Sequence, residues 1–269
     1  MSYLTSIGIA VPDNRFEQSE LGKFMVRAMQ PDYENSRKLH AIFRSGGISH
    51  RHSVLSDYGK ETGFSFYSDT KDLEPFPSTA KRMDEYQKHA PDLCVAAINN
   101  CLVKLSGFNK RTITHLVVVS CTGMYAPGLD IDLVERLSLR HDVQRISINF
   151  MGCYAAFNAI KVGDAFCKAD PNATVLMVCV ELCSIHFQKQ PTEDNMLANA
   201  LFADGAAAVL IQGQPAAGIM LEPVAFHNTL SFSADAQMAW RVGDQGFEMK
   251  LTSYVPEIIR NGIKNLTDE

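Results

Sequence analysis

The stretch ISINFMGCYAAFNAIKVGDAFCKADPNATVLMVCVEL, residues 146–182, is the most informative about fold class. It contains two short, largely apolar runs, residues 146–150 and 175–182, separated by a segment with helical character. Short apolar runs that alternate with helices are typical of strands in a sheet covered on both faces. The stretch therefore predicts two strands of an α/β layer, joined by a helix in a right-handed crossover.

The same pattern continues on both sides of this stretch. Two more strands are predicted at residues 114–120 (THLVVVS) and 206–212 (AAAVLIQ). After Gly213 the pattern changes. The elements predicted there are longer alternating strands around residues 218–232 and 238–251 and a helix over residues 255–266. We therefore place an internal boundary after residue 213.

The first ninety residues are less regular. Their predicted elements are a strand at residues 6–11, a helix capped by Ser19, an amphipathic stretch at 33–43, a polar loop at 65–77 and a helix at 80–105. Pro91 is expected to divide the last helix, because proline cannot donate the backbone hydrogen bond of a helix interior.

The composition is that of a folded protein, with 46% hydrophobic and 20% charged residues. The formal net charge is -5 and Lys and Arg form no basic stripe, so nucleic acid is not an expected partner. No segment approaches the roughly 20 apolar residues that span a bilayer, and the first eleven residues lack the basic region of a signal peptide. We therefore expect a cytoplasmic protein with no membrane segment.

Seven cysteines are present, an odd number, and Cys121, Cys167, Cys179 and Cys183 lie within apolar runs. This favours reduced, buried thiols over a disulfide framework. The spacing of Cys179 and Cys183 could suggest a zinc site, but no second pair of Cys or His residues at zinc-like spacing accompanies it. No metal is therefore expected.

Cys153 follows Gly152 at the start of a helical segment, residues 154–166, with apolar residues on nearly every face. This pattern predicts a helix that is buried all round. A thiol at a helix N-terminus is stabilised as the thiolate, the form that attacks a thioester. Taken alone, however, the pattern is more often that of a core cysteine.

Three segments in this order, MGCYAA (151–156), VLMVCVELCSIHF (175–187) and ALFADGAAAVLI (200–211), closely resemble the active-site block of type III polyketide synthases, the chalcone and stilbene synthase-like family of the thiolase superfamily. Residues 115–130 (HLVVVSCTGMYAPGLD) and 240–259 (WRVGDQGFEMKLTSYVPEII) resemble segments on either side of it. The resemblance implies a thiolase-like α/β fold layered α-β-α-β-α. Residues 1–213 would form the N-terminal half with the nucleophile, and residues 214–269 would begin an incomplete C-terminal half.

The resemblance also implies the reaction. Members of this family load an acyl group from CoA onto a cysteine, extend it with malonyl-CoA by decarboxylative Claisen condensation, and cyclize the product. Acyl-CoA and malonyl-CoA would be the substrates, and no cofactor is implied. A homodimer is implied as well, although Ala126 stands where the family has the Met that crosses the dimer interface.

Site residues follow from their place in the matching motifs. Cys153 matches the nucleophile and Phe202 the aromatic gatekeeper between the CoA tunnel and the cavity, while Met249 falls at the second gatekeeper, which is usually Phe. The remaining matches are three residues that line the elongation cavity and a buried acid near it: Cys121, Cys183, His186 and Glu181, in that order. Arg51, in the stretch GISHRHSVL (47–55), is a candidate contact for CoA phosphate.

Several of these residues have a plainer interpretation. Cys121 and Cys183 fit core packing as well as they fit a cavity wall. His186 could be a hydrogen-bonded histidine at the end of a strand, and Arg51 a single arginine on a solvated face. Met249 would soften the pocket wall relative to Phe.

The family's mechanism also needs a His and an Asn from the second half, and their motifs, a His-Pro-Gly-type turn and a Gly-Asn turn, do not occur in residues 1–269. We therefore expect a truncated chain that does not run the full condensation by itself and that exposes apolar surface on its central helices. Two alternatives stay open. One is a 3-ketoacyl synthase III-like condensing enzyme of fatty-acid synthesis, and the other is a noncatalytic partner subunit with a thiolase-like fold.

Overall fold

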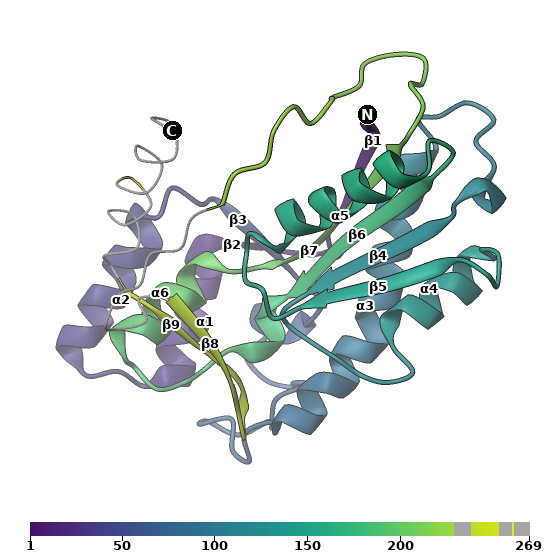
Figure 1. Ribbon diagram of the computed structural model, residues 1–269. Coiled ribbons are helices and arrows are strands. Elements are labelled where there is room, and N and C mark those ends of the chain that lie inside the picture. The colour runs from purple at the N-terminus through teal and green to yellow at the C-terminus, as the bar shows by residue number, and fades with distance from the viewer. Residues whose placement is uncertain (229–237, 253–259, 261–269) are drawn as a thin grey trace. The chain divides into compact units, whose positions relative to one another are not determined.

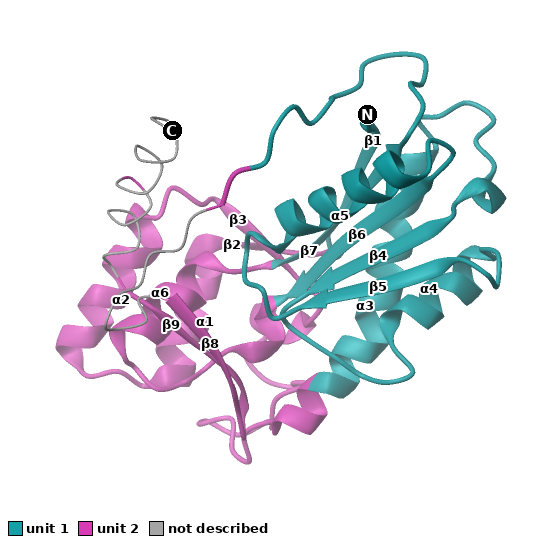
Figure 2. Ribbon diagram, viewed as in Figure 1, with its two compact units in different colours: residues 1–12, 83–182, 204–226 teal, residues 13–82, 183–203, 227–269 magenta. Residues whose placement is uncertain are grey.

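The computed structural model describes residues 1–228, 238–252 and 260. The chain forms two compact units, each assembled from three stretches of sequence (Figure 2). Unit 1 comprises residues 1–12, 83–182 and 204–226, and unit 2 comprises residues 13–82, 183–203 and 227–269. Both units take segments from either side of residue 213. They are therefore units of packing, and the boundary between two related halves stays a prediction.

Unit 1 is built around a five-stranded mixed sheet in the order β1-β7-β6-β4-β5 (Figure 1). Its strands are β1 (Tyr3–Ala10), β4 (His115–Ser120), β5 (Gln144–Asn149), β6 (Thr174–Leu182) and β7 (Asp204–Gln212). β4 pairs in parallel with β5 and β6, whereas β7 runs antiparallel to β6 and β1. The predicted α/β layer is confirmed, and the strands lie within a few residues of their predicted positions.

Helices cover both faces of this sheet (Figure 1). α5 (Ala155–Ala169) lies on one face. On the other face lie α4 (Leu129–Leu137) and the part of α3 (Thr79–Leu102) from Met83 onward, and Arg136 of α4 is bonded to Asp92 of α3. A short 3-10 turn, η2 (Lys110–Thr112), precedes β4. Among the described residues, no helix combines the length and apolar character needed to cross a membrane.

The core of unit 1 between α5 and the sheet is formed by alternate strand residues and small helix residues. They are Val117, Val119, Val175, Met177, Val209 and Ile211 of the strands with Ala155, Ala159 and Cys167 of α5. Glycine brings the two layers close, because a Cβ at Gly163 would lie 2.6 Å from Cδ1 of Ile211. Close packing of this kind fixes the position of α5 on the sheet.

α5 is not buried all round, which corrects the expectation from its sequence. Phe157 is 68% exposed, and Met151 and Tyr154, just before the helix, are exposed as well. The apolar pattern could not separate the inner face of small residues from the outer face that carries Phe157. The apolar surface expected on this central helix is therefore present.

α3 runs without a break through Pro91, so the predicted division of this helix is wrong. A proline in a helix interior removes one backbone hydrogen bond and crowds the preceding turn. Here Ala90, Cys94, Ala97 and Ile98, before and after the proline, are completely buried. Their packing holds the two parts of the helix in line.

The region after Gly213 also departs from the prediction. No strand forms over residues 218–228, where Leu221 alone makes a bridge, to Leu4. Residues 238–251 form a hairpin of β8 (Met238–Gly243) and β9 (Gly246–Leu251) rather than one strand, because Gly246 adopts a φ of 109° that permits a tight turn. The predicted helix over 255–266 lies outside the described residues, apart from position 260.

Unit 2 consists of short elements. They are α1 (Gln18–Met29), α2 (Tyr33–Ser45), α6 (Glu193–Leu201), the strand pair β2 (Asn14–Glu17) and β3 (His50–Ser53), the β8–β9 hairpin, and two 3-10 turns, η1 (Ser56–Gly59) and η3 (Cys183–His186). α1 begins after Glu17 rather than at the predicted Ser19 cap, because Glu17 and Glu20 form a reciprocal capping box.

The segment predicted as a polar surface loop, residues 65–77, has no helix or strand, but several of its side chains are buried. Phe66, Tyr67 and Phe76 are buried, and the rings of Tyr67 and Phe76 stack with their centroids 5.8 Å apart. The buried carboxylate of Asp57 accepts the backbone N–H groups of Ser65, Phe66 and Tyr67 at 2.8, 2.8 and 3.0 Å. This loop is therefore part of the core of unit 2.

Gly8 marks the closest approach of β1 to α3. A Cβ there would lie 2.2 Å from the backbone nitrogen of Cys101 and 2.4 Å from the carbonyl oxygen of Ala97. We expect Gly8→Ala to lower the free energy of unfolding by about 3 kcal/mol, because backbone atoms cannot move aside as a side chain can. Gly205→Ala in β7 is the control, since its Cβ would lie 3.6 Å from the nearest atom. Urea unfolding followed by far-UV circular dichroism measures the difference, and equal stability of the two variants would contradict the packing.

Candidate active site

Cys153 lies in the turn between β5 and α5. After Asn149 the backbone turns through Phe150 and Gly152, both with positive φ (55° and 81°), and α5 begins at Ala155. No atom lies within 4 Å of the position that a Cβ of Gly152 would take, so the backbone angle, and not crowding, calls for glycine. Of the seven cysteines, Cys153 is the exposed one, so a reagent can reach its sulfur.

The backbone just before Cys153 contacts Cys121, which follows β4. The N–H of Gly152 donates to Sγ of Cys121 at 3.3 Å. The N–H of Cys121 donates to both carboxylate oxygens of Glu181, at 2.9 and 3.1 Å, and the hydroxyl of Thr122 donates to the same carboxylate at 2.7 Å. Cys121, Glu181 and the turn that carries Cys153 therefore form one connected group in unit 1.

Burial dominates the protonation of this group. It raises the pKa of Glu181 to about 7, although hydrogen bonds from Thr122 and Cys121 favour the ionised form. The pKa of Cys121 is raised as well, first by burial and then by the charge of Glu181. Cys121 is therefore a thiol at neutral pH and a poor nucleophile, while Glu181 can exchange a proton near neutral pH.

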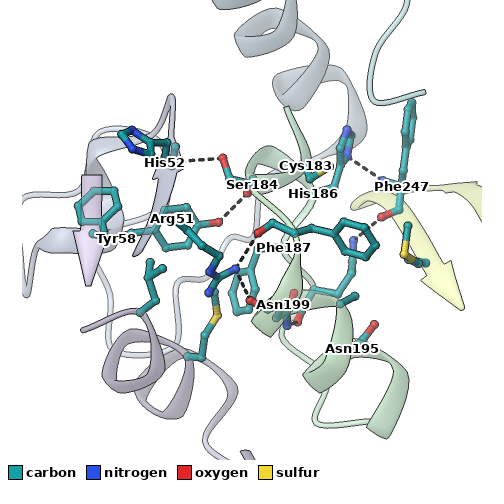
Figure 3. A pocket seen from close by; sticks show the side chains of 18 of the residues that line it. Arg51, His52, Tyr58, Cys183, Ser184, His186, Phe187, Asn195, Asn199 and Phe247 are labelled. Carbon is teal, nitrogen blue, oxygen red and sulfur yellow. Dashed lines mark hydrogen bonds between the residues drawn. The ribbon is translucent and has the colours of Figure 1, made fainter. Parts of the chain in front are cut away.

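Unit 2 contains a pocket of about 50 Å³, which has room for a few water molecules (Figure 3). Its walls come from both strands of the hairpin, from α1, α6 and η3, and from β2, β3 and η1. Five of the residues singled out in the sequence line it: Arg51, Cys183, His186, Phe202 and Met249. The fold thus brings together residues that lie up to about two hundred positions apart in the sequence. The pocket itself is small, since sites for drug-sized ligands are several-fold larger.

Arg51 is buried, which corrects its interpretation as an arginine on a solvated face. It is 7% exposed, and its Nε donates to Oε1 of Gln18 at 2.8 Å. Its Nη1 donates to the carbonyl oxygens of Asn199 and Phe202, both at 2.7 Å. These contacts hold the end of α6 and the backbone of Phe202. A contact of Arg51 with CoA phosphate stays a prediction.

His186 is buried between two aromatic side chains. Its ring stacks on Phe247, with centroids 4.3 Å apart, and Trp240 meets it edge-on at 5.7 Å. Nδ1 of His186 accepts the backbone N–H of Phe247 at 2.9 Å, so this nitrogen carries no proton. His186 therefore fastens η3 to β9, in addition to forming part of the pocket wall.

Some pocket residues were not singled out from the sequence. They are Tyr58, Ser184, Asn199, Trp240 and Phe247. Trp240 and Phe247 lie in a segment that resembles the family, and the alternation of side chains along a hairpin could have indicated which of its residues share a face. Tyr58 and Asn199 come from a turn and a helix whose sequences give no sign of a pocket.

Cys179 and Cys183, the pair with metal-like spacing, are not part of a larger cluster. In the described part of the chain, no group of three or more His, Cys, Asp and Glu side chains is arranged to hold a metal ion. Burial, followed by the charges of Glu181 and Cys121, raises the pKa of Cys179 to about 12. A thiol that keeps its proton is a poor metal ligand.

Known proteins share these features of sequence. The profile of the family described as "Chalcone and stilbene synthases, N-terminal domain" matches residues 1–215. "Probable polyketide synthase 1" of Dictyostelium discoideum is 31% identical over 274 residues, which cover 99% of this chain and 8% of that protein. "1,3,6,8-tetrahydroxynaphthalene synthase" of Streptomyces peucetius subsp. caesius is 28% identical over 270 residues, which cover 96% of this chain and 65% of that protein. The chain thus spans less than two thirds of the length of either relative.

The fold is also shared with solved structures. The C-terminal type III polyketide synthase domain of Steely1, a type I/III hybrid from Dictyostelium, superimposes with a TM-score of 0.90 at 29% identity. The match covers 99% of this chain and 72% of that chain. The α/β fold of the chain is therefore that of the type III polyketide synthase structures.

Titration of Glu181 should make stability depend on pH. Its pKa is about 7 in the folded protein against 4.5 for an ordinary glutamate, so the folded state binds the proton more tightly than the unfolded chain. This contribution is fully present below pH 4.5 and is lost as the pH rises to 7 and above. Glu181→Gln does not titrate. The free energy of unfolding of the wild type, relative to this variant, should therefore fall by about 3 kcal/mol between pH 4.5 and pH 8.

Urea unfolding at several pH values measures this difference. Glu61→Gln, at an exposed carboxylate, serves as the matched control. A difference between the wild type and Glu181→Gln that stays constant over this pH range would show that folding does not raise the pKa of Glu181.

Proposed function

Because the chain belongs to the chalcone and stilbene synthase family, we propose that it is an acyltransferase of the type III polyketide synthase kind with Cys153 as its nucleophile. The observation that carries this proposal is the exposed thiol of Cys153, directly before α5, in the segment that resembles the family's active-site block. The family match also favours this reaction over that of a ketoacyl synthase III-like enzyme.

Loading of the acyl group is the first step of the proposed reaction. The Cys153 thiolate attacks the carbonyl carbon of an acyl-CoA thioester, CoA leaves as its thiol, and the acyl group becomes a thioester of Cys153. Cys153 lies two residues before Ala155, close to the N-terminal end of α5, where the positive end of the helix dipole would stabilise an anion. The neighbouring Cys121 is unsuited to the role, because its raised pKa keeps it a thiol.

The later steps are proposed from the family. They are decarboxylation of malonyl-CoA, Claisen condensation of the resulting carbanion with the bound acyl group, and repeated extension followed by cyclization. The resemblance assigns them to a His and an Asn of the second half in addition to the nucleophile. Loading needs the nucleophile and is therefore the step for which Cys153 can be tested.

The pocket of unit 2 is proposed to bind the acyl part of the CoA substrates. Phe202 and Met249 stand where the family has its gatekeepers, and Cys183 and His186 where it has a cavity wall. Their meeting around one pocket supports these roles. The thioester itself activates the acyl group, so no cofactor is proposed, and a cytoplasmic homodimer is proposed on the family resemblance.

Replacement of the nucleophile should abolish loading. Incubation of the wild type with acetyl-CoA, followed by intact-mass analysis, should show an increase of one acetyl group. Cys153→Ala should show none, because the other thiols are partly or wholly buried. Cys167→Ala, at a buried cysteine of α5, should leave the adduct in place.

Protection from alkylation separates a catalytic cysteine from one that is merely accessible. Iodoacetamide should react first at Cys153 on exposure alone, so preference by itself does not discriminate. Prior incubation with acetyl-CoA should slow this alkylation. A noncatalytic partner subunit would give neither an acetyl adduct nor protection of Cys153 from alkylation. Loading from an acyl carrier protein but not from acetyl-CoA would favour the ketoacyl synthase III-like enzyme.

Met249 should influence which acyl group is accepted. Met249→Ala removes a flexible side chain from the wall of a pocket of about 50 Å³, so longer acyl groups should fit better. We expect the ratio of octanoyl to acetyl loading, measured by intact mass with the two CoA esters, to rise several-fold. Met238→Ala in β8 is the control, because Met238 is exposed and does not line the pocket. An equal rise in both variants would rule out the proposed role of Met249.

A further inference from the structure

Arg82, in the first turn of α3, is a completely buried cation. In the described part of the chain it has no carboxylate partner, and its Nη2 has no hydrogen-bond acceptor. Burial of a cation without a counter-charge is strongly unfavourable. The contacts of Arg82 show which elements of unit 2 the buried side chain holds in place.

One set of contacts of Arg82 holds the backbone of η3. Nη1 of Arg82 donates to the carbonyl oxygen of Ile185, the residue between the pocket residues Ser184 and His186. Nε donates to the carbonyl oxygen of Pro77 at 3.1 Å. The planar guanidinium therefore ties η3 to the segment that leads into α3.

A second set of contacts reaches the β8–β9 hairpin. A Cβ at Gly246 would lie 2.7 Å from Cδ of Arg82, so the backbone of the hairpin turn rests directly on this side chain. Three residues earlier in α3, the hydroxyl of Thr79 donates to the carbonyl oxygen of Gly243 and accepts the N–H of Gly246 at 2.8 Å. The first turn of α3 thus supports the hairpin that supplies three pocket residues: Trp240, Phe247 and Met249.

A third route runs through two buried tyrosines. Burial raises the pKa of Tyr67 to about 12, against the opposing charge and hydrogen bond of Arg82. The hydroxyl oxygens of Tyr67 and Tyr58 lie 3.1 Å apart, and Tyr58 donates to the carbonyl oxygen of Ser184 at 2.6 Å. The two hydroxyls, with the charge of Arg82 acting on Tyr67, therefore present a hydrogen-bond donor to the backbone of η3.

We propose that Arg82 is a positioning residue for the pocket, which holds η3 and the β8–β9 hairpin in register and so sets the acyl groups that the pocket accepts. The selectivity for acyl groups rests on the function proposed above, whereas the positioning requires no reaction. Lysine cannot replace the guanidinium fully, because a single ammonium lacks the planar fork that reaches two carbonyl oxygens. An apolar residue would leave the carbonyl oxygen of Ile185 without its donor.

Trp240 provides a direct measurement of this positioning. It is the single tryptophan of the chain, it lines the pocket, and its ring meets His186 and Phe247 edge-on. In Arg82→Lys and Arg82→Met, the emission of Trp240 should shift to the red and quenching by acrylamide should increase several-fold, more in the Met variant. Neither measurement depends on activity.

Arg27→Met is the matched control. Arg27 also lies against aromatic rings of unit 2, 5.5 Å from Phe24 and 5.7 Å from Phe64, and it also donates to a carbonyl oxygen, that of Lys60. None of these contacts is with η3 or the hairpin. The fluorescence of Trp240 should therefore stay as in the wild type.

The outcomes separate the proposal from the proposed function. Unchanged fluorescence in folded Arg82→Lys and Arg82→Met would overturn the positioning role; if the Met variant does not fold, Arg82→Lys and Thr79→Val decide in the same way. Changed fluorescence together with a several-fold change in the ratio of octanoyl to acetyl loading supports the whole proposal. Changed fluorescence with an unchanged ratio overturns the link to selectivity. A further outcome is that the wild type fails to load acetyl-CoA while the fluorescence of the Arg82 variants changes. That result would contradict the acyltransferase function and still support the positioning role of Arg82.

Discussion

The close packing of α5 on the sheet of unit 1 is the constraint on which the position of Cys153 depends. Ala155, Ala159 and Gly163 keep the inner face of the helix narrow, and Gly163 lies against the side chain of Ile211. With the helix fixed this close, the chain must turn sharply after β5, and the positive φ of Gly152 makes that turn. The exposure of the thiol is therefore a consequence of helix packing and turn geometry, and not of cysteine chemistry.

The parts of the fold that the sequence could predict are those whose signal is local. The strands of the sheet are apolar because both faces are covered, and this is visible in the runs themselves. The errors arise where tertiary contacts decide. α3 continues through Pro91 because buried residues before and after the proline hold it in line. Residues 218–228 alternate like a strand but pair with no neighbouring strand beyond one bridge at Leu221.

The candidate site shows the same division. Cys153 could be found from its motif, because the glycine, the cysteine and the helix follow one another in the chain. The contacts of the two buried arginines could not be predicted in this way, since Arg51 and Arg82 have the sequence context of surface residues. Their partners are backbone carbonyl groups of Phe202 and Ile185, more than one hundred positions away. Every residue has the same backbone carbonyl group, so the sequence does not show which carbonyl oxygen accepts a hydrogen bond from an arginine.

This reliance on backbone acceptors has a consequence for specificity. The pocket walls are joined through the carbonyl oxygens of Phe202, Ser184 and Ile185, which are present whatever side chains stand at those positions. Lining side chains such as Met249 can therefore change without loosening the walls. The chain keeps the fold of the Steely1 domain with a TM-score of 0.90 at 29% identity, so most side chains differ on a preserved backbone. A pocket held by its backbone is one physical means by which a common framework can select different acyl groups.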